Sequence, residues 1–328
     1  MKKAARILAI LFGIVLLGAT ILNANLVSKS RAALSRGVFR ADSGAYVARY
    51  HLIVAIPDTD DSYFRGLLDG INQEVKNAEA AVQVFRYTAS SGQEAQRCFD
   101  LAVRARVDGL IMFSSRNDPI DARAAEARRA GVTFIPVCTD PPTTKDTFFV
   151  GTDSLRHGFE SASIILGKLG SAARIGVILP STGSENPKDE PFYHGIHSAT
   201  TVYPGARIES LLRARPGALS GEESAAAMLR RQPPVNAIIC SSAKDTIGAA
   251  QVIIDMNKVG EVLIVGTDES PDIKRYVDNG VVIASIVRDS QAIGRAAIRA
   301  FSALHAGSIT MDPVESGFSI YQAAEKSK

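Results

Sequence analysis

Short apolar runs alternate with longer amphipathic segments over most of this chain. The first such unit reads YHLIVAIPDTDDSYFRGLLDGI, from Tyr50 to Ile71. Its apolar half, 51–57, predicts a buried strand, and the spacing of apolar residues from Phe64 onwards predicts a helix. A polar turn rich in carboxylates joins the two. In α/β sheets, ligands bind outside the carboxyl ends of the strands, which is where this turn would lie.

The same order of strand, turn and helix recurs and divides into two sets of about five strands. Strands are expected at 51–57, 81–87, 109–113, 132–138 and 148–150, then at 174–179, 207–212, 236–240, 262–265 and 281–287, with a last one at 317–321. Strands that alternate with helices at this spacing form parallel sheets with right-handed crossovers. The 328-residue chain is therefore predicted to be an α/β protein with two doubly wound parallel-sheet lobes and a ligand cleft between them.

The N-terminus has a different pattern. Lys2, Lys3 and Arg6 precede an uncharged run that ends at Ser28. This arrangement predicts that residues 1–28 are a signal peptide or a retained membrane anchor. Both alternatives stay open, because the small residues that favour cleavage are poorly placed. The polar stretch 29–49 is expected to be a linker to the first strand.

Charge separates the N-terminal stretch from the rest of the chain. The formal net charge is +3, but residues 1–49 carry +7 and the remainder carries −4. A mildly acidic folded part argues against nucleic acid as a partner. The three cysteines, Cys98, Cys138 and Cys240, are widely spaced, which favours small buried side chains over a disulfide framework or a metal site.

Motifs for cofactor or metal chemistry are missing from the sequence. It has no G-x-G-x-x-G, no phosphate-binding G-x-x-x-x-G-K-[ST] and no G-x-S-x-G elbow, so no cofactor is expected. His194 and His197 are three residues apart, but no third ligand stands nearby, which favours solvated or capping histidines over a metal. Paired carboxylates in the first polar turn leave a glycoside-acting enzyme as the less favoured alternative, because no nucleophile stands at a fixed spacing from a base.

The polar ends of the predicted strands have a simpler common interpretation as a sugar site. Carboxylates accept hydrogen bonds from hydroxyl groups, arginine donates in a planar fork, and an aromatic face covers the apolar C–H face of a sugar ring. The candidates are the acceptors Asp58, Asp61, Asp140 and Asp268, the forks Arg116 and Arg288, and the aromatic faces of Tyr63 and Phe64. Structural roles compete with these. Phe64 could belong to the core, Asp61 could cap the helix, and Arg288 could serve only as an ion-pair partner of Asp268.

Several segments, taken in order, resemble the periplasmic sugar-binding proteins of the ribose-binding type, whose fold is shared with lactose-repressor-like regulators. The similarity covers about residues 50–322. It is carried by DDSYF at 60–64, where the family often has Asn-Asn-Pro-Phe-Phe, and by DGLIMFSS at 108–115, AGVTFIPVCTD at 130–140, VGTDESPDI at 265–273 and ASIVRDSQAIG at 284–294. The resemblance implies that Asp140 and Asp268 are sugar-binding aspartates.

The chain departs from the family pattern at several of the implied ligand contacts. Asp61 and Ser242 stand where the family usually has asparagine, and Arg288 replaces a glutamine. Pro141 stands where an arginine usually follows the aspartate. The segment 180–192 lacks the expected arginine, so a charged residue there, Glu190 among them, would have to substitute. These changes indicate a ligand other than ribose, and Arg288 leaves an acidic ligand open.

The resemblance also implies an organisation and a role. The family's chain crosses between lobes three times, which implies that residues 50–153 and 289–315 form lobe one and residues 154–288 and 316–328 form lobe two. The implied function is an extracytoplasmic solute-binding protein, in the periplasm or on the outer face of the cytoplasmic membrane. It would clamp a sugar or sugar-like ligand by hinge closure and deliver it to the permease of an ABC importer. The alternative is a membrane-anchored sensor that partners a histidine kinase or a chemoreceptor.

Overall fold

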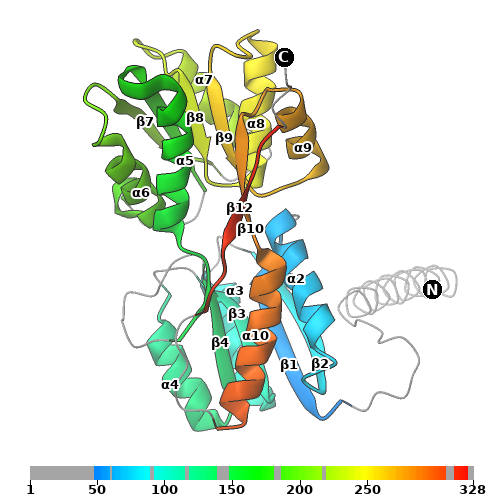
Figure 1. Cartoon of the computed structure of the whole chain (residues 1–328). Helices are drawn as coiled ribbons and strands as arrows, with labels where there is room; N and C mark the ends of the chain where they lie inside the picture. Colours follow the sequence, from blue (N-terminus) through cyan, green and yellow to red (C-terminus); the bar gives the residue numbers. More distant parts are fainter. Residues whose placement is uncertain are drawn as a thin grey trace, which may run out of the picture.

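The computed structural model describes residues 48–59, 61–88, 92–114, 118–138, 148–180, 186–215, 219–307 and 314–323. Figure 1 shows two lobes, one above the other, joined by a narrow region of strands. The predicted signal peptide or anchor lies outside the described residues, and so do Arg116 and Asp140. Within the described ranges, no helix is both long enough and apolar enough to cross a bilayer.

Lobe one is built on a parallel sheet of six strands in the order β11-β5-β4-β3-β1-β2. The strands are β1 (Tyr50–Pro57), β2 (Ala80–Tyr87), β3 (Gly109–Ser114), β4 (Thr133–Cys138), β5 (Val150–Gly151) and β11 (Val314–Glu315). Alternate residues of β1 face opposite sides. Leu52 packs with α2 (Ser62–Glu74) and α10 (Ser290–His305), and Ile53 packs with α3 (Gly92–Ala105) and α4 (Ile120–Ala130). Both faces are therefore covered, as a parallel sheet requires.

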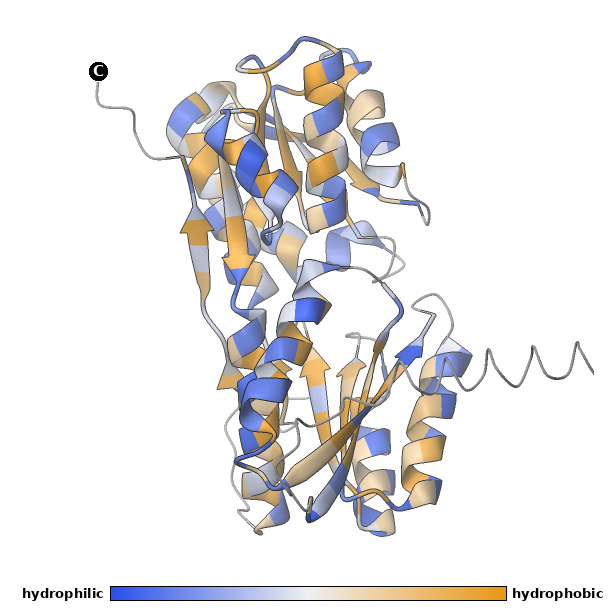
Figure 2. Ribbon diagram, turned by 90° about the vertical axis from the view of Figure 1, so that its right-hand side faces the viewer, coloured by the Kyte–Doolittle hydropathy of each residue, from blue (hydrophilic) through white to orange (hydrophobic). Residues whose placement is uncertain are grey.

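Lobe two repeats this plan in the order β12-β10-β9-β8-β6-β7. Its strands are β6 (Arg174–Leu179), β7 (Arg207–Arg213), β8 (Ala237–Cys240), β9 (Leu263–Thr267), β10 (Ala284–Arg288) and β12 (Phe318–Tyr321). The helices α5 (Ser154–Leu169) and α6 (Pro191–Thr200) pack on one face. The helices α7 (Ser220–Leu229), α8 (Ala243–Asp255) and α9 (Pro271–Asp278) pack on the other. Two short 3-10 turns, Gly170–Ala172 and Pro187–Asp189, complete the described elements. Figure 2 shows that the strands of both sheets are largely apolar and that the helices beside them carry both apolar and polar residues.

The sequence prediction of two α/β lobes is confirmed, and the structure corrects its details at the last strands. Strand β11 was not expected, and β12 pairs antiparallel with β10 in an otherwise parallel sheet. Only residues 316–317 separate β11 from β12. Because the carboxyl ends of both sheets point toward the junction, a strand that continues from lobe one into lobe two must run against the strands that it joins.

The chain passes between the two sheets three times, after β5, after β10 and after β11. Close packing of α2 against α10 fixes lobe one beside the second passage. A β-carbon on Gly70 would lie 2.1 Å from the backbone oxygen of Gln291, and one on Gly294 would lie 2.2 Å from that of Leu67. These glycines let the helix backbones approach closely, so the middle of α2 packs against the first turn of α10.

Candidate functional site

A cleft of about 890 Å³ lies where the two lobes meet. Its size falls within the range of small-molecule sites in proteins, roughly 300–1,000 Å³. The first turns of α2 line it from lobe one, and the segment after β9 lines it from lobe two. The ends of β10 and β12 complete it. The lining residues include Ser62, Tyr63, Gly66, Asp268, Arg288 and Phe318.

An ion pair between Asp268 and Arg288 lies at this cleft. Asp268 follows β9 directly with φ +61°, a left-handed conformation that aspartate tolerates better than most residues. Arg288, the last residue of β10, donates from Nε to Asp268 Oδ1 at 2.8 Å and from Nη2 to Oδ2. The side chains are only 11% and 5% exposed. Burial by itself lowers the pKa of Arg288, but the Asp268 carboxylate outweighs that effect and raises it, so the guanidinium stays charged.

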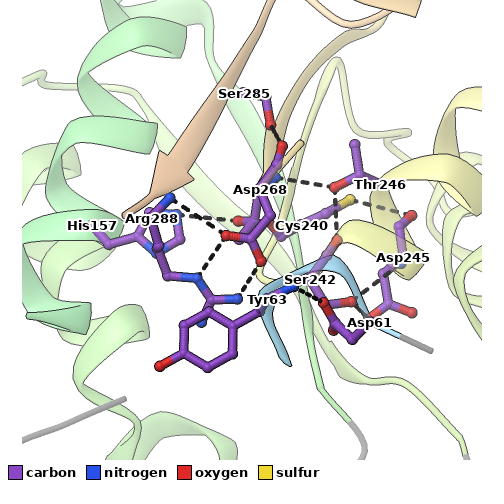
Figure 3. A network of polar contacts seen from close by, with 11 residues as sticks. Asp61, Tyr63, His157, Cys240, Ser242, Asp245, Thr246, Asp268, Ser285 and Arg288 are labelled. Atoms are coloured by element: carbon purple, nitrogen blue, oxygen red, sulfur yellow. Dashed lines mark hydrogen bonds and ion pairs between the residues drawn. The ribbon is translucent and has the colours of Figure 1, made fainter. Parts of the chain in front are cut away.

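The first turn of α2 brings Tyr63 against this ion pair. The guanidinium carbon of Arg288 lies 4.4 Å from the centroid of the Tyr63 ring, a cation–π contact (Figure 3). Phe64 is buried and packs edge-on against Phe113, with ring centroids 4.9 Å apart. Phe64 therefore belongs to the hydrophobic core of lobe one, the role that competed with sugar binding in the sequence analysis. One face of the Tyr63 ring is covered by Arg288.

Asp61 caps α2 and also carries charge into the site. Its Oδ1 accepts the backbone N–H of Tyr63 at 2.9 Å, as an N-cap residue does. Burial raises the pKa of Asp61, the Asp268 carboxylate raises it further, and Arg288 opposes both. The structure thus brings Asp61, Tyr63, Asp268 and Arg288 together from the two lobes.

This chain matches the periplasmic binding protein domain family over residues 52–308. It belongs to the periplasmic binding protein family. Among curated proteins, the D-allose-binding periplasmic protein of Escherichia coli is 23% identical over 277 residues, which is 80% of this chain and 86% of that protein. The resemblance inferred from the sequence is confirmed, and members of this family are binding proteins.

Solved structures show the same fold. A glucose-galactose binding protein from Geobacillus stearothermophilus superposes with a TM-score of 0.73 at 21% identity, covering 83% of this chain and 97% of its own. A periplasmic solute-binding protein from Actinobacillus succinogenes, solved with bound D-allose, gives a TM-score of 0.73 at 18% identity, covering 84% and 98%. This periplasmic binding protein therefore has the two-lobe architecture of sugar-binding relatives.

In this periplasmic binding protein, the side chain of Ser242 forms its hydrogen bonds with Asp245 of helix α8. It caps α8 by accepting the backbone N–H of Asp245 at 3.2 Å, and its hydroxyl lies 2.6 Å from Asp245 Oδ2. Asp245 also accepts from Ser220 at 3.3 Å. Burial raises the pKa of the Asp245 carboxyl, and the two serine hydroxyls lower it in part. Ser242 and the buried Asp245 thus form one hydrogen-bonded polar unit after the end of β8.

Glu190 is also held by the protein. Its Oε1 accepts from Arg213 Nη2 at 2.7 Å, and Arg213 Nη1 donates to the backbone oxygen of Pro180 at 2.9 Å. Arg213 is the last residue of β7. It brings an arginine to the segment 180–192, where the sequence showed none. The position of Arg213 at the carboxyl end of a predicted strand could have indicated that its side chain lies near this segment.

Asp58 lies apart from the other candidates. It is exposed and lines a separate cavity of about 410 Å³ with Thr59, Arg65 and Arg86. Arg116 and Asp140 are outside the described ranges. Of the ten predicted contacts, the structure therefore gathers four, Asp61 and Tyr63 beside the Asp268–Arg288 pair, and places Asp58 elsewhere.

His157 was missed by the sequence reasoning. It lies on α5, 4% exposed, with Nε2 at 3.1 Å from Thr267 Oγ1. Thr267 Oγ1 donates to the backbone oxygen of Cys240 at 2.7 Å, so the imidazole must donate to Thr267 from Nε2. Burial, together with the nearby Arg288, lowers the pKa of His157 to about 3. Helical spacing could have indicated burial of His157, but not its partner on a strand 110 residues away.

Proposed function

We propose that this protein binds a sugar in the cleft between its lobes, outside the cytoplasmic membrane, and delivers it to an ABC importer. The observation that carries the proposal is the meeting of Asp61, Asp268, Arg288 and Tyr63, from both lobes, at one cleft. Carboxylates accept from sugar hydroxyls, and arginine donates in a fixed fork. The names of relatives support the same class, since several bind D-allose or other aldoses.

The proposed ligand is a neutral aldose. Arg288 uses its fork on both oxygens of Asp268, so its charge is already compensated within the protein. The Asp61 carboxylate adds negative charge on the same side of the cleft. An anionic ligand would meet the carboxylates of Asp61 and Asp268 there, while the Arg288 fork is already engaged by Asp268. This argues against the acidic ligand that Arg288 alone had left open.

Domain closure is the proposed mechanism of capture. We assign residues 50–153 and 289–315 to lobe one and residues 154–288 and 316–328 to lobe two, in agreement with the membership of the described strands in the two sheets. Three connecting segments allow the lobes to rotate while each sheet stays intact. Closure would exclude water from the hydrogen bonds to the ligand and present a new surface to a permease.

A thermal-shift screen tests the ligand class. The panel contains D-allose, D-glucose, D-galactose, D-arabinose and D-fucose, with D-glucuronate, D-galacturonate and adenosine as the competing classes. An aldose at about 100 times its Kd stabilises the native state by about 2.7 kcal/mol, which raises the melting temperature by roughly 5–10 °C. If only the sugar acids or only adenosine stabilise the protein, the ligand belongs to that class and not to the aldoses. If none of the eight compounds stabilises it, the proposal is refuted.

Import, sensing and catalysis are separated by further measurements. Deletion of the protein should abolish uptake of the labelled aldose by cells if it serves an importer. Normal uptake with loss of aldose-induced gene expression would favour the sensor alternative. Turnover of nitrophenyl glycosides that vanishes in Asp268→Asn would favour an enzyme instead.

A further inference from the structure

Tyr63 carries a buried hydroxyl with no hydrogen-bond partner among the residues that the structure describes. The residue is 3% exposed. Tyr87, another buried tyrosine of lobe one, donates its hydroxyl to the backbone oxygen of Phe113 at 2.7 Å. An unpaired buried hydroxyl loses its hydration without compensation, so native proteins rarely retain one without a reason.

Packing prevents the Tyr63 ring from turning to find a partner. Arg288 covers one face at 4.4 Å from the centroid and is itself held by Asp268. Phe64 and Phe113 contact the ring edge-on, with centroids at 5.2 and 6.4 Å. Figure 3 shows the phenol oxygen directed away from the carboxylates of Asp268 and Asp61, so neither accepts its proton.

The Tyr63 phenol is a hydrogen-bond donor at neutral pH. Burial raises its pKa above the ordinary value, and the nearby Arg288 opposes this only in part. The residue also lines the cleft where the ligand is proposed to bind.

We propose that the Tyr63 hydroxyl is a specificity-determining group that donates a hydrogen bond to an oxygen of the bound sugar. The inference rests on the proposed function and deepens it. The site should then prefer an aldose with a hydroxyl at that place over the deoxy analogue, because only the former pairs with the buried phenol.

The variants Tyr63→Phe and Tyr87→Phe form a matched pair, since each removes one buried hydroxyl. Their melting temperatures without ligand are compared first. Tyr63→Phe should melt at the wild-type temperature or about 2 °C above it, because it removes an unpaired polar group. Tyr87→Phe should melt about 2–4 °C lower, because it removes the hydrogen bond from the Tyr87 hydroxyl to the Phe113 carbonyl. A drop for Tyr63→Phe like that of Tyr87→Phe would show a partner within the protein and overturn the inference.

Calorimetric titration supplies the second measurement. The probe is whichever of D-allose, D-glucose, D-galactose, D-arabinose and D-fucose binds most tightly, together with its monodeoxy analogues. Tyr63→Phe should lower the affinity for the parent sugar about tenfold. One monodeoxy analogue should bind the variant and the wild type with equal affinity. Tyr87→Phe should leave affinity unchanged. Equal affinity of Tyr63→Phe and wild type for the parent sugar overturns the inference. A wild type that binds none of the five refutes the proposed function, and the melting comparison still decides whether the hydroxyl is unpaired.

Discussion

The guanidinium carbon of Arg288, at the end of a lobe-two strand, lies 4.4 Å from the ring centroid of Tyr63, in the first turn of a lobe-one helix. The same guanidinium is held on Asp268 by its fork. One side chain thus joins the two lobes through an ion pair on one side and an aromatic face on the other. A ligand that enters the cleft must bind beside this contact or change it.

Removal of one member of the Asp268–Arg288 pair should destabilise the protein. Arg288→Gln leaves a buried carboxylate without its counter-charge, and Asp268→Asn leaves a buried guanidinium. Each change should lower the free energy of unfolding by about 3 kcal/mol. Asparagine tolerates the positive φ of residue 268 as aspartate does, so the variant tests charge and not backbone strain. Urea unfolding at pH 7 measures the effect.

The double variant is the control for this pair. Arg288→Gln with Asp268→Asn removes both charges and should be more stable than the sum of the single effects predicts, by about 2 kcal/mol. Additive losses would mean that the two side chains do not stabilise each other.

Asp61→Asn should stabilise the unliganded protein at neutral pH. Asparagine keeps the N-cap and removes a buried negative charge beside Asp268. The pKa of Asp61 is raised in the folded state, so the folded state binds the proton more tightly than the unfolded state. The contribution of this group to stability therefore falls as pH rises through the raised pKa.

The expected gain for Asp61→Asn is about 2 °C in melting temperature at pH 7, and it should shrink as pH falls below about 3, where the carboxyl is protonated in both states. Asp61→Ala loses the cap as well and should melt below Asp61→Asn at every pH. A lower melting temperature for Asp61→Asn than for wild type at pH 7 would contradict the prediction.

His157 should make stability decrease under mildly acidic conditions. Its pKa of about 3 in the folded state lies below the ordinary value of 6.5, so the unfolded state binds the proton first. This contribution is fully present above pH 6.5 and is lost as pH falls toward 3. It amounts to about 1 kcal/mol between pH 7 and pH 5.5.

The measurement is the free energy of unfolding at those two pH values for His157→Gln and wild type. The variant should lose about 1 kcal/mol less than wild type between them. His194 is exposed, so His194→Gln is a matched control that should keep the wild-type pH dependence. Equal slopes for wild type and His157→Gln would show that the imidazole is not held neutral.

Arg213 should resist conservative replacement. Its guanidinium binds Glu190 and the Pro180 carbonyl at once, which a lysine ammonium at the end of a flexible stem cannot reproduce in the same geometry. Arg213→Lys should lower the free energy of unfolding by about 1.5 kcal/mol, the contribution of one hydrogen bond to a charged group. Arg207→Lys, at the exposed start of the same strand, should have no effect on thermal unfolding. Equal effects of the two replacements would contradict the prediction.

Much of the fold was predictable because strands and helices have local periods. Strand β6 has the bounds expected from the sequence, and strands β3, β4 and β7 differ from theirs by one residue. Helix α6 begins at Pro191, in the first turn of a helix, a position that proline favours. Strand β11 has two residues, too few for a period to appear. The direction of β12 depends on where β11 lies and so is not a local property.

The sequence by itself determined which segments form most of the strands and which polar side chains follow them, because a periodicity of two or 3.6 residues is readable within one element. The sequence therefore placed Asp61, Tyr63, Asp268 and Arg288 at candidate positions. Only the tertiary structure decided that Arg288 turns onto both Asp268 and Tyr63, that His157 meets Thr267, and that Arg213 holds Glu190. Those partners are fixed by sheet order and by the junction of the lobes, and contacts between distant segments leave no local period in the chain.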